Sequence, residues 1–248
     1  MFAATPTQYA VFRSAGPGQP WESGGAGLEG QIVNYLAADR LGRVYATAGF
    51  EAFSSDDGGA SWQIAWRAFS IFEPTVGPIA IHPLDPNVVY IGTCGPFPRR
   101  GQTVLRSLDR GSTWTRTADL GFACLKRLAL HPTEPRTLLA ADREGRVIRS
   151  TDGADTWTSV GLESVSDTLF AGSDPVQIFA GERTRVLRSA DLGMTWQASG
   201  PEFPAPLTSL ARHPQGSEWL FAGTAGAGVY QSRDEGDTCL PSTSASRT

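Results

Sequence analysis

A short pattern recurs along the 248-residue chain and limits its fold more than any other feature. The pattern is S-x-D-x-[G/A]-x-[S/T]-W, and it occurs in SSDDGGASW (54–62), RSLDRGSTW (106–114), RSTDGADTW (149–157) and RSADLGMTW (188–196). A fifth copy, QSRDEGDTC (231–239), has Cys239 in place of the tryptophan. A sixth and degenerate copy, RSAGPGQPW (13–21), has Gly16 in the aspartate slot. Six copies in register indicate one structural unit that is used six times.

The spacing of the copies identifies that unit. The last positions of successive copies lie 41, 52, 43, 39 and 43 residues apart, and a period near 40 is typical of one four-stranded blade of a β-propeller. Short apolar runs on either side of a His-Pro turn separate the copies in 77–93, 126–142 and 208–224, and no long helical periodicity occurs. The sequence therefore predicts an all-β fold, a β-propeller of about six four-stranded blades.

The repeat also predicts the blade boundaries. We expect a propeller over 1–240, with a partial blade at 1–30, blades at about 31–75, 76–121, 122–165 and 166–204, and a partial blade at 205–240. The first blade lacks an inner strand and the last an outer one, which predicts a fragment of a longer, seven-bladed protein or a truncated reading frame. Open blade edges allow self-association. Residues 241–248 form a Ser/Thr-rich tail that we expect to be disordered.

On these motifs, the chain resembles the BNR/Asp-box repeat family over residues 1–239. Members of that family include sialidases, sortilin-type receptors, some glycoside hydrolases and photosystem assembly factors. The resemblance implies the propeller fold. It implies no single activity, because members with unrelated functions share the box.

Each position that recurs among the copies of the box has a structural role. The aspartate can accept backbone hydrogen bonds and close a turn, the glycine permits a left-handed conformation, and the tryptophan supplies buried apolar area. The residues assigned to these structural tasks are Ser55, Asp57, Gly59, Trp62, Ser107, Asp109, Gly111, Trp114, Ser150, Asp152, Trp157, Ser189, Asp191, Gly193, Trp196, Ser232, Asp234 and Gly236.

No catalytic residue, metal site or cofactor site is assigned. The box aspartate occurs on five different blades, whereas one active site needs one set of groups. The three histidines, His82, His131 and His213, occupy the same His-Pro turn, which favours a turn role over a metal site. GAGLEG (25–30) matches a dinucleotide motif but precedes a strand-like segment. The three cysteines show no C-x-x-C pair, so we expect neither a disulfide framework nor structural zinc.

The resemblance to sialidases can be tested directly, since it implies an arginine triad whose first member lies in an F/Y-R-I-P motif. Here Phe12-Arg13 is not followed by Ile-Pro, and Arg13 occupies the same repeat position as Arg106, Arg149 and Arg188. The main hypothesis is therefore a non-catalytic binding or assembly scaffold. A glycoside hydrolase, or the remnant of one, is the alternative.

Binding is expected where the sequence stops repeating, at the connections between second and third strands. The face opposite the boxes would then carry Arg99, Arg100, Arg143, Glu144, Glu182 and Arg183, with Phe97 and Trp66 nearby. This surface suits a protein, peptide or carbohydrate ligand, although ordinary solvated turn charges give the same pattern. A net charge of −4 argues against nucleic acid.

The cellular compartment is inferred from the lack of a targeting pattern in the sequence. The N-terminus shows no signal-peptide pattern, and no apolar run approaches the roughly 20 residues of a membrane span. We therefore expect a cytoplasmic protein, or an extracellular or periplasmic one if the chain is a fragment.

Overall fold

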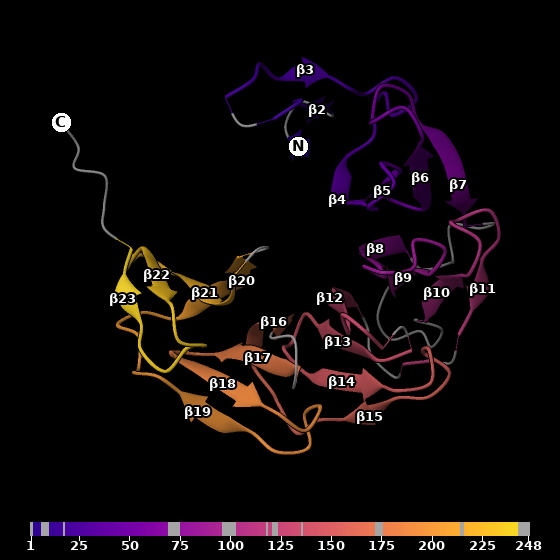
Figure 1. Cartoon of the computed structure of the whole chain (residues 1–248). Helices are drawn as coiled ribbons and strands as arrows, with labels where there is room; N and C mark the ends of the chain where they lie inside the picture. The colour runs from indigo at the N-terminus through magenta and orange to yellow at the C-terminus, as the bar shows by residue number, and fades with distance from the viewer. Residues whose placement is uncertain are drawn as a thin grey trace. The chain divides into compact units, whose positions relative to one another are not determined.

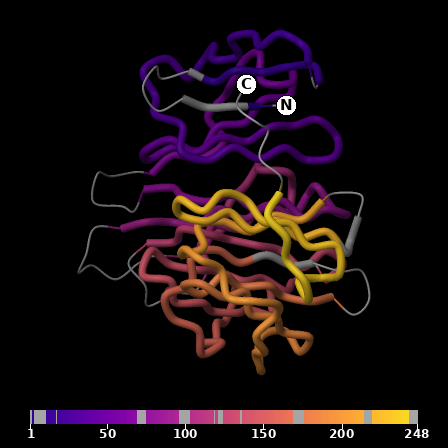
Figure 2. The backbone as a smooth tube through the Cα atoms, turned by 90° about the vertical axis from the view of Figure 1, so that its left-hand side faces the viewer, coloured from indigo at the N-terminus to yellow at the C-terminus, as the bar shows by residue number. Residues whose placement is uncertain are grey.

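Six antiparallel sheets follow one another along the chain, and no helix occurs among the residues that the structure describes (Figure 1). The structure is a computed structural model that describes residues 2–5, 10–16, 18–68, 75–95, 103–117, 119–120, 124–134, 136–171, 176–213 and 216–242. Figure 2 follows the chain from a second direction, with the remaining residues in grey. The all-β prediction is confirmed.

The first sheet has three strands in the described residues, in the order β1-β2-β3. They are β1 (Phe2–Thr5), β2 (Ala10–Arg13) and β3 (Glu22–Ser23). Strand β1 pairs antiparallel with β2, and Phe2 lies opposite Arg13. This arrangement agrees with the expectation that the first repeat begins at a second strand.

The other five sheets each have four strands. The second comprises β4 (Val33–Ala38), β5 (Val44–Ala48), β6 (Glu51–Ser55) and β7 (Gln63–Arg67). The third comprises β8 (Thr75–Ile81), β9 (Val89–Cys94), β10 (Val104–Ser107) and β11 (Thr115–Arg116). The fourth comprises β12 (Leu125–Leu130), β13 (Leu138–Asp142), β14 (Val147–Ser150) and β15 (Thr158–Ser159).

The fifth sheet comprises β16 (Val165–Ala171), β17 (Gln177–Glu182), β18 (Arg185–Ser189) and β19 (Gln197–Ser199). The sixth comprises β20 (Leu207–His213), β21 (Gly216–Thr224), β22 (Val229–Ser232) and β23 (Leu240–Pro241). The expectation that the last repeat lacks its outer strand is wrong. Leu240 and Pro241 pair with Gln231 and Tyr230, because a two-residue strand is long enough to continue the ladder. The described part of the tail ends at residue 242.

Burial decreases from the second strand to the fourth in the second, third, fourth and fifth sheets. Strands β5 and β13 are buried at every position, whereas β7, β11 and β15 are largely exposed. Continuous small and apolar runs such as VYATA and LLAAD suit a strand that is covered on both faces. Since the strands follow one another antiparallel, the box turns and the His-Pro turns lie at one end of each sheet. The second-to-third connections lie at the other end.

The chain divides into two compact units, residues 1–138 with 151–156, and residues 139–150 with 157–248. The division passes through the sheet β12–β15. Each unit is described by itself below.

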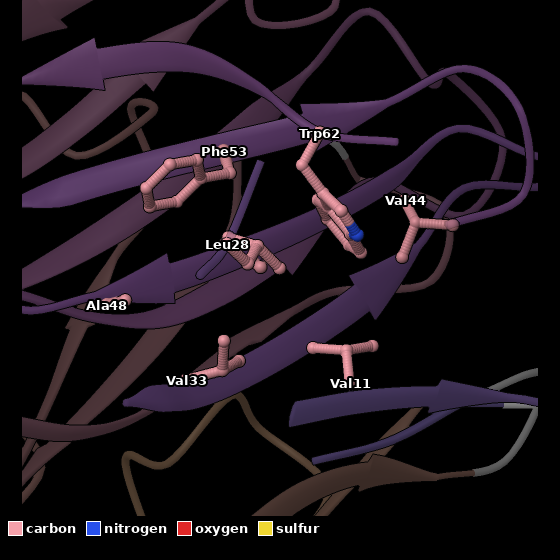
Figure 3. Close-up of a cluster of buried hydrophobic side chains, with 8 residues drawn as sticks. Val11, Leu28, Val33, Val44, Ala48, Phe53 and Trp62 are labelled. Carbon is pink, nitrogen blue, oxygen red and sulfur yellow. The ribbon is translucent and has the colours of Figure 1, made fainter. Parts of the chain in front are cut away.

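A buried cluster in the first unit shows how one sheet packs on the next. Trp62, at the end of the second box, lies with Val33, Val44 and Phe53 of its own sheet and with Val11 of the first sheet. Leu28 completes the contact, and Figure 3 shows it beside the Trp62 ring. All of these side chains are at most 9% exposed, so the apolar area they bury holds the two sheets together.

Candidate functional site

The box is a closed hydrogen-bonded turn, as RSLDRGSTW shows. The Ser107 hydroxyl donates to Asp109 Oδ1 at 2.8 Å and accepts from the Gly111 N–H at 2.7 Å. Asp109 in turn accepts from the Thr113 N–H at 2.8 Å and from the Thr113 hydroxyl at 2.5 Å. The Ser107 hydroxyl and both carboxylate oxygens of Asp109 therefore bond to groups within the same turn. This supports the structural role inferred from the repetition of the box.

The same bonds recur in the other boxes, with lengths of 2.6–2.9 Å. They join Ser55, Asp57, Gly59 and Ser61; Ser189, Asp191, Gly193 and Thr195; and Ser232, Asp234, Gly236 and Thr238. In the third box Asp152 accepts from the N–H and the hydroxyl of Thr156 at 2.9 and 2.6 Å, and Ser150 is buried.

Two successive residues in each of these five boxes have a left-handed backbone. The pairs are Gly58–Gly59, Arg110–Gly111, Gly153–Ala154, Leu192–Gly193 and Glu235–Gly236, with φ between 56° and 94°. In the third box the glycine has moved one position earlier, so an alanine occupies the second left-handed position. Each pair therefore keeps at least one residue without a Cβ, which limits the steric cost of the turn.

The turn bonds also explain the electrostatics of the box. Hydrogen bonds from Thr113, and then from Ser107, lower the pKa of Asp109 to about 2. Bonds from Ser232 and Thr238 likewise lower the pKa of Asp234 to about 2, and the pKa values of Asp57 and Asp191 are also lowered. A carboxyl group that stays ionised is a poor general acid, so these aspartates are suited to structure.

Two of the box tryptophans, Trp62 and Trp196, bond to the preceding sheet, whereas Trp114 Nε1 donates to the Gly111 carbonyl of its own box at 3.1 Å. Trp62 Nε1 donates to the Gly24 carbonyl at 2.6 Å, just after β3, and Trp196 Nε1 donates to the Val160 carbonyl at 3.1 Å, just after β15. Gly24 must be a glycine, because a Cβ there would lie 2.4 Å from the Gly59 carbonyl oxygen. Gly27 meets the Trp62 carbonyl in the same way, so the GAGLEG segment serves sheet packing.

The arginine that precedes a box bonds to the following box, a role that the sequence did not reveal. Arg106 Nη1 donates to the Gly153 carbonyl at 2.8 Å, and Arg149 Nη1 donates to the Leu192 carbonyl at 2.7 Å. Arg13 reaches the Asp57 carbonyl at 3.4 Å, and Arg188 forms an ion pair with Asp237 at 3.3 Å. The repeat position itself was visible in the sequence, but its target lies 43 to 49 residues further along the chain.

Two of the three histidines close the His-Pro turns. His82 Nδ1 accepts from the Asp85 N–H at 3.0 Å, and His131 Nδ1 accepts from the Glu134 N–H at 3.0 Å. Burial lowers the pKa of both rings and so favours their neutral form, and the hydrogen bond that Nδ1 accepts places the ring proton on Nε2. His213 differs, since it ends β20 and lies beside the Trp219 ring at 5.6 Å. Within the described residues, no group of three or more His, Cys, Asp or Glu side chains is placed to hold a metal ion.

The opposite end of the sheets carries the predicted binding residues, and in the second unit the structure brings four of them together. Arg143 and Glu144 lie in the β13–β14 turn, and Glu182 and Arg183 lie where β17 turns into β18. Val165 lies between the two turns, because its N–H donates to the Gly145 carbonyl at 3.0 Å and it pairs with Glu182.

The arginines at this end differ in their partners. Arg146 pairs with the buried Asp142 at 2.6 Å, and Arg185 pairs with Glu202. Arg143 and Arg183 are exposed and form no ion pair with a described residue. Arg99, Arg100 and Phe97 lie outside the described residues, and Trp66 is half-buried beside the cluster that contains Val76 and Ile91.

The buried carboxylates are held by partners of their own. Asp39 accepts from Arg110 Nε at 2.7 Å and from the Leu41 N–H at 2.8 Å. Asp142 accepts from Arg146 Nε at 2.7 Å, and Asp167 accepts from the Leu210 N–H at 2.9 Å. These hydrogen bonds link strands and turns, so the three carboxylates have a structural role.

A disulfide joins Cys94, at the end of β9, to Cys124, immediately before β12. The expectation that the cysteines form no disulfide framework therefore missed this bond. A separation of 30 residues carries no recognisable spacing, and only the packing of successive sheets brings the two thiols together. Cys239 is free and half-buried.

Comparison with known proteins identifies the family. The family model described as "Sortilin-Vps10: Sortilin, neurotensin receptor 3" matches residues 50–184, more than half of the chain. The chain belongs to the Sortilin-Vps10 family. The resemblance to the Asp-box repeat group, which includes sortilin-type receptors, is thereby confirmed. No helix in the described part of this Sortilin-Vps10 chain is long and apolar enough to cross a membrane.

Relatives of known activity are similar over part of the chain. A xyloglucanase from Acetivibrio thermocellus is 31% identical over 189 residues, which is 64% of this chain and 22% of the relative. A probable oligoxyloglucan-reducing end-specific xyloglucanase from Neosartorya fischeri is 32% identical over 90 residues, which is 33% of this chain and 11% of the relative. The Sortilin-Vps10 chain thus spans about a fifth or less of the length of these relatives.

Solved structures confirm the propeller fold of the chain. The GH74 enzyme of Niastella koreensis matches with a TM-score of 0.67 and 17% identity, over 93% of this chain and 33% of that one. YCF48 bound to D1 peptide matches with a TM-score of 0.60 and 13% identity, over 85% of this chain and 68% of that one. At these identities the likeness is one of fold, and it confirms the predicted all-β propeller.

Proposed function

We propose that this chain is a non-catalytic binding module that holds an extended, carboxylate-bearing polypeptide segment across the second-to-third turns. One observation carries the proposal: Arg143 and Arg183 lie in turns on either side of Val165, exposed and without an ion pair to a described residue. A guanidinium group binds a carboxylate with two parallel hydrogen bonds, so two successive turns offer two anchoring points along one ligand.

The neighbouring charged residues support the interpretation that Arg143 and Arg183 bind a ligand, rather than being ordinary solvent-exposed charges of a turn. Arg146 and Arg185 stand next to these two arginines, and each already has a carboxylate partner. The turns are also anchored, since the Leu207 N–H donates to the Arg183 carbonyl at 2.6 Å and the Phe203 N–H to the Thr184 carbonyl at 2.8 Å. Anchored turns hold their side chains in place at a lower entropic cost on binding.

The carboxyl groups support binding over hydrolysis. A glycoside hydrolase needs a carboxylic acid whose pKa is raised, together with a second carboxylate. Wherever a shift is resolved for a carboxyl group among the described residues, hydrogen bonds or arginines lower its pKa, as for Asp39, Asp56 and Asp109.

Fluorescence anisotropy with a labelled peptide of alternating aspartate and serine tests the proposal at low and high salt. The double variant Arg143→Gln/Arg183→Gln should bind at least about tenfold more weakly, because it loses charge-assisted hydrogen bonds. Arg40→Gln, which removes an exposed arginine elsewhere, is the matched control. Equal affinity of all three proteins would refute the proposed site. A second double variant, Arg99→Gln/Arg100→Gln, tests the remaining expectation from the sequence.

A glycan-active protein is the second candidate, favoured by the 31% identity to the Acetivibrio thermocellus xyloglucanase. Release of reducing sugar from xyloglucan measures it. Turnover that is lost in Glu144→Gln or Glu182→Gln but kept in Arg143→Gln/Arg183→Gln would overturn the non-catalytic proposal. Xyloglucan binding without turnover would instead replace the peptide by a glycan as the ligand.

We further propose that the chain works in an oxidising compartment, extracellular or periplasmic. The Cys94–Cys124 disulfide supports this, because such bonds persist where thiols are not kept reduced. Intact-mass measurement of protein purified under alkylating conditions, with and without reductant, tests it. Complete alkylation of all three cysteines without reductant would contradict the proposal.

A further inference from the structure

A polar hollow of about 330 Å³ lies at the box end of the fifth sheet. Its walls come from β17, β18 and β19 and from the box between the last two of these strands (Figure 1). The whole lining belongs to the second unit. It includes Gln177, Arg188, Ala190, Asp191 and Gln197.

Two side chains fill the corresponding place in the second sheet. The position just before the second-strand residue that pairs with the box serine is Arg43 there and Gln177 in the fifth sheet. The position just after that serine is Asp56 there and Ala190 in the fifth sheet. Arg43 Nε and Nη2 donate to the two carboxylate oxygens of Asp56, each at 2.6 Å, and Arg43 Nη1 donates to the Arg110 carbonyl of the next box. A guanidinium group therefore occupies this place in the second sheet.

The sixth sheet also has a guanidinium group at this pair of positions. Its equivalent residues are Trp219 and Arg233, and the Arg233 guanidinium stacks on the Trp219 ring at 4.5 Å. In the fifth sheet neither of the two residues is an arginine, since Ala190 ends at Cβ and Gln177 ends in an amide. The hollow is the space beside these two shorter side chains.

Gln177 offers a hydrogen-bond acceptor at this place. Its Nε2 donates to Glu235 Oε2 of the next box at 2.8 Å. Its Oε1 is buried and has no hydrogen-bond partner among the described residues. A buried acceptor without a donor is unfavourable, so an N–H group that a ligand brings there gains a partner.

The charges around the hollow favour a cation. Arg188, on its wall, already pairs with Asp237 at 3.3 Å. Asp191 lies on the wall as well, and hydrogen bonds from Thr195 hold the pKa of its carboxyl below the usual range. Neither Asp191 nor Glu235 forms an ion pair with a described residue. Two carboxylates therefore border the hollow together with one arginine whose charge is compensated.

We propose that this hollow binds a guanidinium group, carried by an arginine side chain of a polypeptide or by a small arginine-like molecule. The N–H groups of the ligand would donate to Gln177 Oε1 and to the neighbouring carboxylates, as those of Arg43 donate in the second sheet. A guanidinium group suits flat amide and carboxylate acceptors because its five N–H donors lie in one plane. The site lies at the box end of the sheet, so it is separate from the Arg143 and Arg183 turns and does not rest on their proposed role.

A ligand-observed NMR titration with Nα-acetyl-arginine amide at low salt tests the proposal. The same measurement uses the lysine and citrulline analogues, which have an ammonium group and an uncharged urea in place of the guanidinium group. The arginine probe should bind at least about tenfold more tightly than either analogue, because it alone combines the positive charge with the planar donors. No binding of the arginine probe, or equal binding of the citrulline probe, would overturn the proposal.

Variants locate the binding site. Gln177→Arg/Ala190→Asp rebuilds the internal pair of the second sheet and fills the hollow, so it should bind the arginine probe at least about tenfold more weakly while it stays folded. Gln177→Met keeps the length of the side chain but removes the acceptor, and it should also weaken binding. Gln63→Met is the matched control, since Gln63 is an exposed glutamine of the second sheet. Variants that bind the probe as the wild type does would refute the site, and far-UV circular dichroism confirms that each one retains its strands.

A peptide of glycine and serine with one central arginine separates the two sources of the guanidinium group. Tighter binding of this peptide than of the small probe would assign the hollow to a polypeptide partner, whereas equal binding would assign it to a small arginine-like molecule. In both cases Gln177→Arg/Ala190→Asp should abolish the binding. Peptide binding that persists in this variant would place the contact elsewhere and contradict the proposal.

Discussion

The Ser107 hydroxyl makes two hydrogen bonds within its box. It donates to Asp109 Oδ1 and accepts from the Gly111 N–H. It is 1% exposed, so water cannot replace it. We predict that Ser107→Ala lowers the free energy of unfolding by about 1–3 kcal/mol, because a buried N–H loses its acceptor.

Urea denaturation monitored by tryptophan fluorescence measures that change. Ser112→Ala is the control, because the Ser112 hydroxyl bonds the Asp109 carbonyl at an exposed position. Its effect should stay within about 0.5 kcal/mol. If the two variants lost the same stability, the buried hydroxyl would not be what closes the turn.

Gly111 illustrates the second constraint at the scale of single residues. Its φ is +80°, and a Cβ would lie 3.0 Å from Tyr45 Cε1 and 3.3 Å from Trp114 Cζ2. We predict that Gly111→Ala destabilises the chain by about 1–2 kcal/mol or more, from the left-handed backbone and the crowded ring.

Thermal unfolding of Gly111→Ala beside Gly25→Ala checks this prediction. Gly25 has open space and no positive φ, so alanine there should be neutral or slightly stabilising. A loss of stability at Gly25 equal to that at Gly111 would contradict the argument from backbone conformation.

At the scale of sheets, the repeated arginine is the element that couples one box to the next. Arg149 Nη1 donates to the Leu192 carbonyl at 2.7 Å, between consecutive sheets of the second unit. We predict that Arg149→Met, which keeps the apolar stem, lowers the free energy of unfolding by about 1.5–3 kcal/mol. Arg40→Met, at an exposed turn position, should change it little in the same denaturation experiment.

The paired His-Pro turns make two sheets sensitive to pH. Burial lowers the pKa of His82 and His131, so the folded chain binds protons less readily than the unfolded chain. Their contribution to stability is therefore present above the ordinary histidine pKa of about 6.5 and is lost as pH falls through the lowered folded values.

We predict that the free energy of unfolding declines as pH falls from about 7 toward 5, and that His82→Asn/His131→Asn flattens this decline. Asparagine keeps an acceptor for the turn N–H groups but does not titrate in this range. Urea midpoints across the pH series provide the measurement. An unchanged slope in the double variant would assign the decline to other groups.

At the scale of the whole chain, the Cys94–Cys124 bond closes a loop across two sheets. We predict that Cys94→Ser/Cys124→Ser, or reduction, lowers the free energy of unfolding by about 2–4 kcal/mol. Cys239→Ser is the control, since that thiol is free. Differential scanning calorimetry with and without reductant should shift the wild type and leave the double variant unchanged.

Much of the fold could be predicted from the sequence because the repeat is a local signal. The box residues lie within nine positions of one another, so their turn chemistry, the count of six sheets and the His-Pro turns were all visible without coordinates. The central strands were visible for the same reason, since Tyr45 and Tyr90 lie in unbroken apolar runs. The strand β23 was not predicted, because a strand of two residues is too short to show an alternating pattern of apolar and polar residues.

The candidate site was predictable only in part. Position in the repeat placed Arg143, Glu144, Glu182 and Arg183 on matching turns, but their partners depend on other segments. Only the folded chain shows that Arg146 and Arg185 are paired, while Arg143 and Arg183 form no ion pair with a described residue.

The sequence by itself therefore determined the unit of this protein, its turn chemistry and its repetition, because those depend on residues close together in the chain. The tertiary structure alone decided what joins one unit to the next: Arg149 on Leu192, Trp62 on Gly24, and Cys94 on Cys124. Contacts between segments 30 to 45 residues apart require the sheets to stack, and no local pattern encodes which atoms then meet.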